Sequence, residues 1–193
     1  MKTVEETLLG IYPLGNEDLQ LLASAGEEIT FRKGEHLVRE GSTDSSFYVI
    51  RDGILRAYYS TEEKDITVWF ATAGEVCYSS WGYQDNAPAR LSIAATCDTA
   101  AIRYTKSQTL DLFFRSSELA HWSYFSLLQL LTSTDYWFLY LSDPDASHRY
   151  CSLMEKYPDI LRHVPLKDIA AYLRITPQSL SRIRSRMARK KQE

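Results

Sequence analysis

The chain has 193 residues, 45% of them hydrophobic, which is enough to bury one large core or two small ones. Its N-terminus is polar and acidic and its apolar runs are short, so we expect a cytoplasmic protein without a signal peptide or membrane span. Residues 162–193 hold nine Lys or Arg and two acids (+7), and the preceding 161 residues hold 13 bases and 23 acids (−10). This split of the net charge of −3 favours binding of a polyanion by the C-terminal segment.

The first half of the chain changes from a helical to a strand period. Residues 1–25 predict two short helices, and Asn16, which precedes two acids, is the predicted N-cap of the second. From 28 to 104 about eight short strands alternate with turn residues. Asp52-Gly53 predicts a hairpin, because both central residues of such a turn need a positive φ. Strands of this number and spacing predict a β-roll, barrel or jelly roll.

Residues 107–141 return to a helical period and predict one long helix. Apolar positions along it step alternately by four and by three residues, as in a coiled-coil seam. This dimer seam comprises Tyr124, Leu127, Leu131, Thr134, Phe138 and Leu141. Other large apolar residues lie off the seam, so we expect one side to pack on the β domain and the seam to pack on a second copy of the chain. The alternative is a central helix buried within one monomer.

The last thirty residues have the pattern of two short helices joined by a tight turn. The first helix has an apolar face made of Leu166, Ile169, Ala170 and Leu173. Thr176 is the predicted N-cap of the second helix, and Pro177 suits its first position. The second helix has a polar, cationic outer face, an arrangement that enters the DNA major groove in helix-turn-helix proteins. The alternative is a charged face that is only solvated.

This order of parts resembles the cyclic-AMP receptor protein and fumarate–nitrate regulator (Crp/Fnr) family of bacterial transcription factors over nearly the whole chain. The local matches are Glu40-Gly41, 47–50, Asp52-Gly53, 73–76, 169–173 and 180–183. The resemblance implies an α+β fold. Its parts are an N-terminal double-stranded β-helix (jelly roll) of the cyclic-nucleotide-binding kind at 1–106, a dimerisation helix at 107–141 and a helix-turn-helix domain at 142–193. It implies a homodimer that binds double-stranded DNA, with RNA polymerase as a further partner.

The resemblance assigns base reading to three positions in the last helix, Gln178, Ser181 and Arg182. Their chemistry agrees, because Arg pairs bidentately with guanine and Gln pairs with adenine. Contacts with DNA phosphates are expected from Lys167, Thr176, Arg184 and Arg186. The basic stretch Arg189-Lys190-Lys191 is either a further phosphate contact or a frayed end.

The effector pocket departs from the family's pattern. Members that bind cyclic AMP have a Gly-Glu pair followed shortly by an Arg that holds the cyclic phosphate. Gly74-Glu75 is present here, but the segment after it is aromatic and has no base before Arg90. A buried phosphate needs a paired cation, so we do not expect cyclic AMP to bind in the usual way. The predicted pocket comprises Gly74, Glu75, Trp69, Tyr78, Trp81 and Arg90. Either a different small molecule binds there, or the aromatic side chains fill the space.

The sequence lacks the residue patterns that other kinds of sensor or an enzyme would need. The cysteines Cys77, Cys97 and Cys151 are scattered and the four His are dispersed, so we predict no metal, haem or iron–sulfur cofactor. A cupin-like metalloenzyme would need a His-x-His pair, so we predict no catalytic residues. Nine residues separate Glu155 from Pro165, so the β-hairpin wing of the best-known family members should be reduced or missing. The alternative function is a sensory β-roll dimer that does not bind specific DNA sequences.

Overall fold

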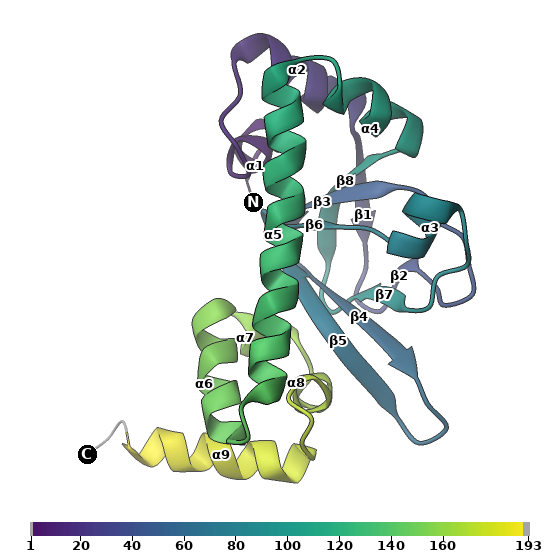
Figure 1. Cartoon of the computed structure of the whole chain (residues 1–193). Coiled ribbons are helices and arrows are strands. Elements are labelled where there is room, and N and C mark those ends of the chain that lie inside the picture. Colours follow the sequence, from purple (N-terminus) through teal and green to yellow (C-terminus); the bar gives the residue numbers. More distant parts are fainter. Residues whose placement is uncertain (1, 191–193) are drawn as a thin grey trace.

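The computed structural model describes residues 2–190. One long helix, α5 (Ser117–Ser142), runs the length of the molecule (Figure 1). A β-roll lies beside this helix, and a group of C-terminal helices lies at its far end. None of the described helices is both long enough and apolar enough to cross a bilayer.

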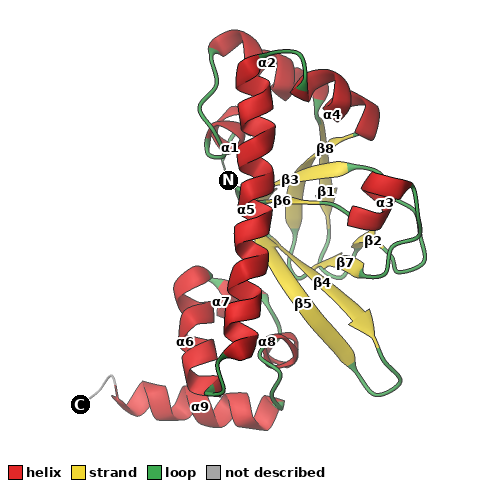
Figure 2. Ribbon diagram, in the orientation of Figure 1, coloured by secondary structure: helices red, strands yellow, loops and turns green. Residues whose placement is uncertain are grey.

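Two antiparallel four-stranded sheets form the β-roll (Figure 2). In chain order the strands are β1 (Glu27–Phe31), β2 (His36–Val38), β3 (Phe47–Asp52), β4 (Ile54–Ser60), β5 (Asp65–Thr72), β6 (Val76–Cys77), β7 (Ser92–Ala95) and β8 (Thr99–Tyr104). One sheet has the order β1-β8-β3-β6 and the other β2-β7-β4-β5. The buried residues of the roll include Ile50, Leu55 and Ile93. This is the predicted jelly roll.

The turn at Asp52-Gly53 is not the predicted hairpin. The strands on either side of it, β3 and β4, belong to different sheets. Of the two turn residues only Gly53 has a positive φ, at 90°. A Cβ atom on Gly53 would lie 2.4 Å from the Thr99 hydroxyl oxygen, so no larger residue fits there. Turn chemistry predicts a reversal locally, but the sheet that each strand joins depends on partners far along the chain.

Helices cover the outer face of the first sheet and join it to α5. These are α1 (Val4–Leu9), α2 (Asn16–Ala25) and α4 (Lys106–Phe113). Asn16 is the first residue of α2 and not its cap, because Gly15 occupies the N-cap position. Trp122 of α5 is fully buried against this group, and its indole nitrogen donates to the Leu8 carbonyl at 2.9 Å. This contact fastens α5 to the roll.

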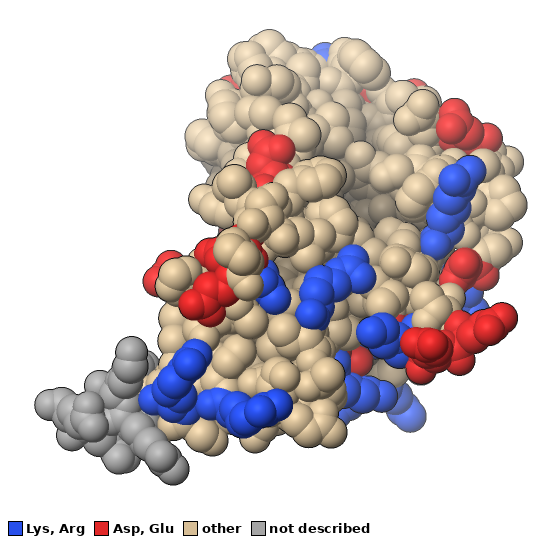
Figure 3. All heavy atoms as spheres, turned by 60° about the horizontal axis from the view of Figure 1, so that its bottom comes forward, with Lys and Arg blue, Asp and Glu red and all other residues tan. Residues whose placement is uncertain are grey.

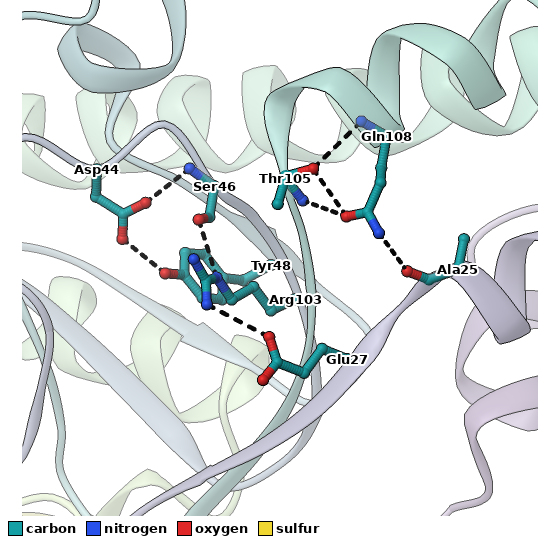
Figure 4. A network of polar contacts seen from close by, with 8 residues as sticks. All are labelled: Ala25, Glu27, Asp44, Ser46, Tyr48, Arg103, Thr105 and Gln108. Atoms are coloured by element: carbon teal, nitrogen blue, oxygen red, sulfur yellow. Dashed lines mark hydrogen bonds and ion pairs between the residues drawn. The ribbon is translucent and has the colours of Figure 1, made fainter.

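Two polar clusters tie loops to the roll (Figure 4). In one, Gln108 completes a capping box with Thr105 at the start of α4 and donates to the Ala25 carbonyl at 3.0 Å. In the other, the Asp44 carboxylate accepts from the Ser46 amide and the Tyr48 hydroxyl, each at 2.6 Å. Such bonds let buried backbone and hydroxyl groups keep partners after they leave water.

The predicted long helix is interrupted. Residues 107–141 form α4 and α5 with a break at 114–116, because Ser116 caps a new helix by accepting from the Leu119 amide at 3.1 Å. The Ser116 hydroxyl also donates to Asp18 at 2.6 Å. The predicted seam lies wholly after this break, so its period did not reveal the break.

After α5 the described residues form four helices: α6 (Ala146–Lys156), α7 (Ile160–His163), α8 (Leu166–Tyr172) and α9 (Pro177–Lys190). Their core includes Leu153, Ile160 and Ile169 and extends to Phe70 of the β-roll. Leu166, which was predicted on the apolar face of α8, is 39% exposed because it is the first residue of that helix. Between α6 and α8 the described residues hold α7 and no strand.

Candidate nucleic-acid interface and a cavity beside α5

The turn between α8 and α9 has a defined geometry. The Ile175 amide donates to the Ala170 carbonyl at 3.0 Å, and Arg174 has a left-handed φ of 55°, as in a Schellman motif. Arg149 of α6 reaches across and donates to the Leu173 carbonyl through Nε and Nη2, at 3.2 and 2.9 Å. These bonds fix the direction in which α9 leaves α8.

Helix α9 begins where the sequence predicted. The Thr176 hydroxyl accepts from the Ser179 amide at 3.1 Å, and Pro177 takes the first helical position. Leu180 and Ile183 are buried against the other C-terminal helices. The predicted base-reading residues Gln178, Ser181 and Arg182 are all exposed. The helix therefore presents a polar face to solvent.

The predicted phosphate contacts have different surroundings. Lys167 and Thr176 are exposed, and Arg184 is half-buried. The Arg186 guanidinium donates to the Ser147 hydroxyl near the start of α6, so it already has a partner within the chain. The side chains of 189–191 lie outside the described part. Figure 3 shows Lys and Arg side chains along the lower edge of this view, over α9.

Helix α5 carries an exposed apolar strip along the predicted dimer seam. Tyr124, Leu131 and Phe138 are 56%, 58% and 59% exposed, and Leu127 and Thr134 are exposed as well. Leu141 is half-buried. A contiguous apolar strip of this kind on one chain marks an interaction surface.

A cavity of about 210 Å³ lies between α5 and the β-roll. Strands β5 and β6 form one wall, and the other wall comes from α5. Of the predicted pocket residues, Trp69, Glu75 and Tyr78 line this cavity. Tyr78 stacks on Phe47, and burial raises the pKa of its hydroxyl. The aromatic side chains therefore leave part of the space empty.

Three predicted pocket residues do not line the cavity. Gly74 forms the turn before Glu75, with φ at 89°. Trp81 belongs to the short helix α3 (Ser80–Asp85), and the Arg90 guanidinium lies 5.9 Å from its ring centroid. Arg90 is exposed. Only Ser80 of this short helix lines the cavity, and the spacing between Glu75 and Arg90 did not bring the two together.

The Glu75 carboxylate holds the turn between β5 and β6. Its Oε2 atom accepts from the Thr72 amide at 2.7 Å and from the Thr72 hydroxyl at 3.2 Å. Among the described residues that line the cavity, Glu75 is the only one with a formal charge. A phosphate placed there would meet the Glu75 carboxylate, and none of the described lining residues carries a positive charge.

The sequence interpretation missed the α5 wall of the cavity. Gln129, Ser133 and Trp137 line it, although the sequence placed them only on a helix. In the described part, the Gln129 Oε1 and Trp137 Nε1 atoms are buried without a hydrogen-bond partner. No local signal identifies such residues, because the strands that complete the cavity lie far away in the chain.

A second missed feature joins the β-roll to α8. The Arg56 guanidinium in β4 lies 3.0 Å from the Asp168 carboxylate, and both side chains are about nine-tenths buried. Arg56 Nε donates to the Thr67 hydroxyl at 2.8 Å, which donates to the Asp168 backbone carbonyl at 3.2 Å. Burial raises the pKa of Asp168, and Arg56 opposes that shift. These contacts fix α8 against β5.

Comparison with known proteins agrees with this architecture. Residues 28–116 match the family model of the cyclic nucleotide-binding domain. The solved structure of FixK2 from Bradyrhizobium japonicum has a TM-score of 0.71 and 19% identity, and covers 86% of this chain and 85% of that chain. No curated protein sequence matches the chain.

Two further solved structures share the fold. The catabolite activator protein of Thermus thermophilus has a TM-score of 0.55 and 20% identity. The match covers 94% of this chain and 87% of that chain. The c-di-GMP-responsive global regulator CLP of Xanthomonas campestris has a TM-score of 0.67 and 11% identity. The match covers 91% of this chain and 93% of the CLP chain. The chain therefore has the fold of the Crp/Fnr regulators, and the resemblance that the sequence indicated is confirmed.

Proposed function

We propose that this protein is a homodimeric transcription regulator that binds double-stranded DNA through α9. The observation that carries the proposal is the polar outer face of this helix. Gln178, Ser181 and Arg182 are exposed there, while Leu180 and Ile183 on the opposite side are buried. A second helix held in this way, with exposed Arg and Gln side chains, suits direct reading of base edges in the major groove.

Charge supports the same assignment. The C-terminal 32 residues carry +7, and the rest of the chain carries −10. Phosphates are attracted to the first region and repelled by the second, which favours approach through α9. Lys167 and Thr176 are exposed and suited to phosphates, whereas Arg186 must first leave Ser147.

The relatives support a role in gene regulation. CLP is described as a global regulator that links cell–cell signalling to virulence gene expression, and the Thermus protein as a catabolite activator. Shared fold alone does not transfer a function. The exposed polar face of α9 is the feature of this chain that supports a regulatory role like that of these relatives.

Dimerisation would follow from the exposed strip on α5. In a two-fold dimer this strip would pack against its own copy and place two α9 helices on one side of the molecule. Two such helices read half-sites about 34 Å apart, in successive major grooves. Thr134 and Phe138 belong to the strip and also line the cavity, so a molecule bound there would touch the dimer seam.

DNA binding is tested by selecting genomic fragments with the purified protein and titrating the enriched site with salt. We expect a palindrome, and a loss of about 1–3 kcal/mol of sequence discrimination in Arg182→Ala. Arg115→Ala is the matched control, because this exposed Arg precedes the first residue of α5, and α9 lies near the other end of that helix (Figure 1). Salt-sensitive binding without sequence preference, unchanged in Arg182→Ala, would instead favour a sensory β-roll with a basic patch.

Dimerisation is tested separately by sedimentation equilibrium. Leu131→Glu places a charge in the middle of the strip and should shift the protein to monomers. Leu110→Glu is the control, since Leu110 is 49% exposed but lies on α4, away from the strip. Equal dissociation by both variants, or by neither, would contradict the proposed interface.

A further inference from the structure

The C-terminal helices bring three sulfur-bearing side chains to one groove. This groove lies between α6 and α9, at the C-terminal end of the molecule (Figure 1). Cys151 and Met154 line it from α6, and Met187 lines it from α9. The chain has three Cys and three Met, so one of these Cys and two of these Met meet at a single place.

The positions of the sulfur atoms suit a shared metal ion. The Cys151 Sγ and Met187 Sδ atoms lie 3.9 Å apart, although the two residues are 36 positions apart in the chain. Metal–sulfur bonds of about 2.3 Å at an angle of about 120° place two sulfur ligands about 4 Å apart. Met154 follows Cys151 by three residues, so it lies on the same face of α6. Its unbranched side chain can turn the thioether toward the other two sulfur atoms.

The three side chains are neither enclosed in the core nor free in solvent. Cys151, Met154 and Met187 are each half-buried. The two Met side chains pack against the core of the C-terminal helices and also line the groove. Each of the three residues therefore has a supported position and a surface that an ion in the groove can reach.

The donor set selects a soft monovalent ion. One thiolate and two thioethers suit Cu(I), whereas Zn²⁺ takes four ligands, mostly thiolate, imidazole and carboxylate groups. Besides Cys151, Glu155 is the only residue of these classes among the described lining residues, and it is exposed. Cu(I) displaces the thiol proton, so the half-buried site stays neutral, whereas Zn²⁺ bound to one thiolate would leave a positive charge.

We propose that Cys151, Met154 and Met187 bind one Cu(I) ion in the groove between α6 and α9. The ion bridges the two helices and fixes α9 against α6. Ser181 and Arg184 of α9 line the same groove, so the ion lies next to the proposed DNA-binding face. The sequence predicted no metal from the positions of its Cys and His, and that pattern does not include Met.

Competition with a coloured Cu(I) chelator measures the site. The reduced full-length protein is titrated without oxygen into the Cu(I) complex of bicinchoninate, and the loss of colour reports the copper that the protein takes. We expect about one equivalent of copper to transfer, and an excess of Zn²⁺ should leave the transfer unchanged. X-ray absorption of the copper-loaded protein should then show about three sulfur neighbours at roughly 2.3 Å.

Variants then test each ligand. Cys151→Ser should weaken Cu(I) binding about 100-fold, and Met154→Leu and Met187→Leu should each weaken it about tenfold. Leu is close to Met in volume, so the two Met variants should keep the fold. Cys97→Ser is the matched control and should leave the affinity unchanged, because Cys97 is also half-buried but does not line the groove.

Three results would overturn the inference. The first is no transfer of copper from the chelator. The second is an equal loss of affinity in Cys97→Ser and Cys151→Ser. The third is unchanged affinity in both Met variants or a single sulfur neighbour in the X-ray absorption, as expected of a lone thiol. X-ray absorption of the wild type needs no variant, so it decides even where a variant folds poorly. Cu(I) binding without a preferred DNA sequence would contradict the proposed function and leave this inference intact.

Discussion

Strand β5 takes part in two interfaces that differ in whether their buried polar groups have hydrogen-bond partners. Thr67 hydrogen-bonds with α8 through the Asp168 carbonyl, and Arg56 of the adjacent strand pairs with the Asp168 carboxylate. Toward α5, Val68 and Trp69 line a cavity beside unpaired atoms of Gln129 and Trp137. One interface is closed and largely hydrogen-bonded, and the other is hollow.

The difference separates a structural contact from a candidate binding site. A buried charge needs a paired partner, and at the α8 interface the Asp168 carboxylate is the partner of the Arg56 guanidinium. The Arg56 Nη2 atom has no hydrogen-bond partner within the described residues. A cavity with unpaired polar atoms lowers stability, and proteins retain such features where function needs them. Removing a polar group should therefore have opposite effects on stability at the two interfaces.

The largest effect is expected at the α8 interface. Asp168→Ala should lower the free energy of unfolding by about 3 kcal/mol, because it leaves the buried Arg56 guanidinium charged and poorly paired. Asp65 at 3.5 Å is 42% exposed and compensates only in part. Urea denaturation measures the loss. Asp159→Ala is the control, since its ion pair with Arg162 is exposed, and should change stability by less than about 0.5 kcal/mol. Equal losses would contradict the comparison.

A smaller loss is expected from Tyr157→Phe. The buried Tyr157 hydroxyl donates to the Phe70 carbonyl of β5 at 3.1 Å, and removing that bond should lower stability by about 1 kcal/mol. Tyr59→Phe serves as the control, because the hydroxyl of this half-buried Tyr makes no hydrogen bond within the described part. The difference between the two denaturation midpoints measures the bond.

A gain is expected at the cavity. Gln129→Met should raise the free energy of unfolding by roughly 1 kcal/mol, because it removes a buried acceptor that has no partner. The same substitution at Gln108 should lower stability by about 1 kcal/mol, since the Gln108 side chain caps α4 and bonds Ala25 (Figure 4). A loss of stability in both variants would mean that Gln129 is as well satisfied as Gln108.

The smallest effect is expected at an exposed carboxylate. Asp145 caps α6, and the hydrogen bond from the Ser147 amide lowers its pKa. The folded protein thus holds the proton less tightly than the unfolded chain. This contribution is present above the unfolded pKa of about 3.9 and is lost as the pH falls through the lower folded pKa. Denaturation midpoints of Asp145→Ala and the wild type should converge at acid pH. A difference independent of pH would contradict this role.

Much of the fold could be predicted because its signals are local. The start of α9 follows from Thr176-Pro177, and its buried and exposed faces follow from a period of 3.6 residues. The strands were found from their period of two. The predictions failed where the structure depends on residues far away in the chain. At Asp52-Gly53, for example, the two flanking strands join different sheets.

The sequence by itself determined the order of parts, the polar and cationic outer face of α9, and the apolar strip on α5. Only the tertiary structure decided which residues meet around β5. Thr67 and Asp168 are 101 residues apart, and the cavity walls come from β5, β6 and α5. Periodicity and capping act over a few residues, whereas a buried ion pair or a cavity depends on how the packed elements fit, which no short stretch of sequence encodes.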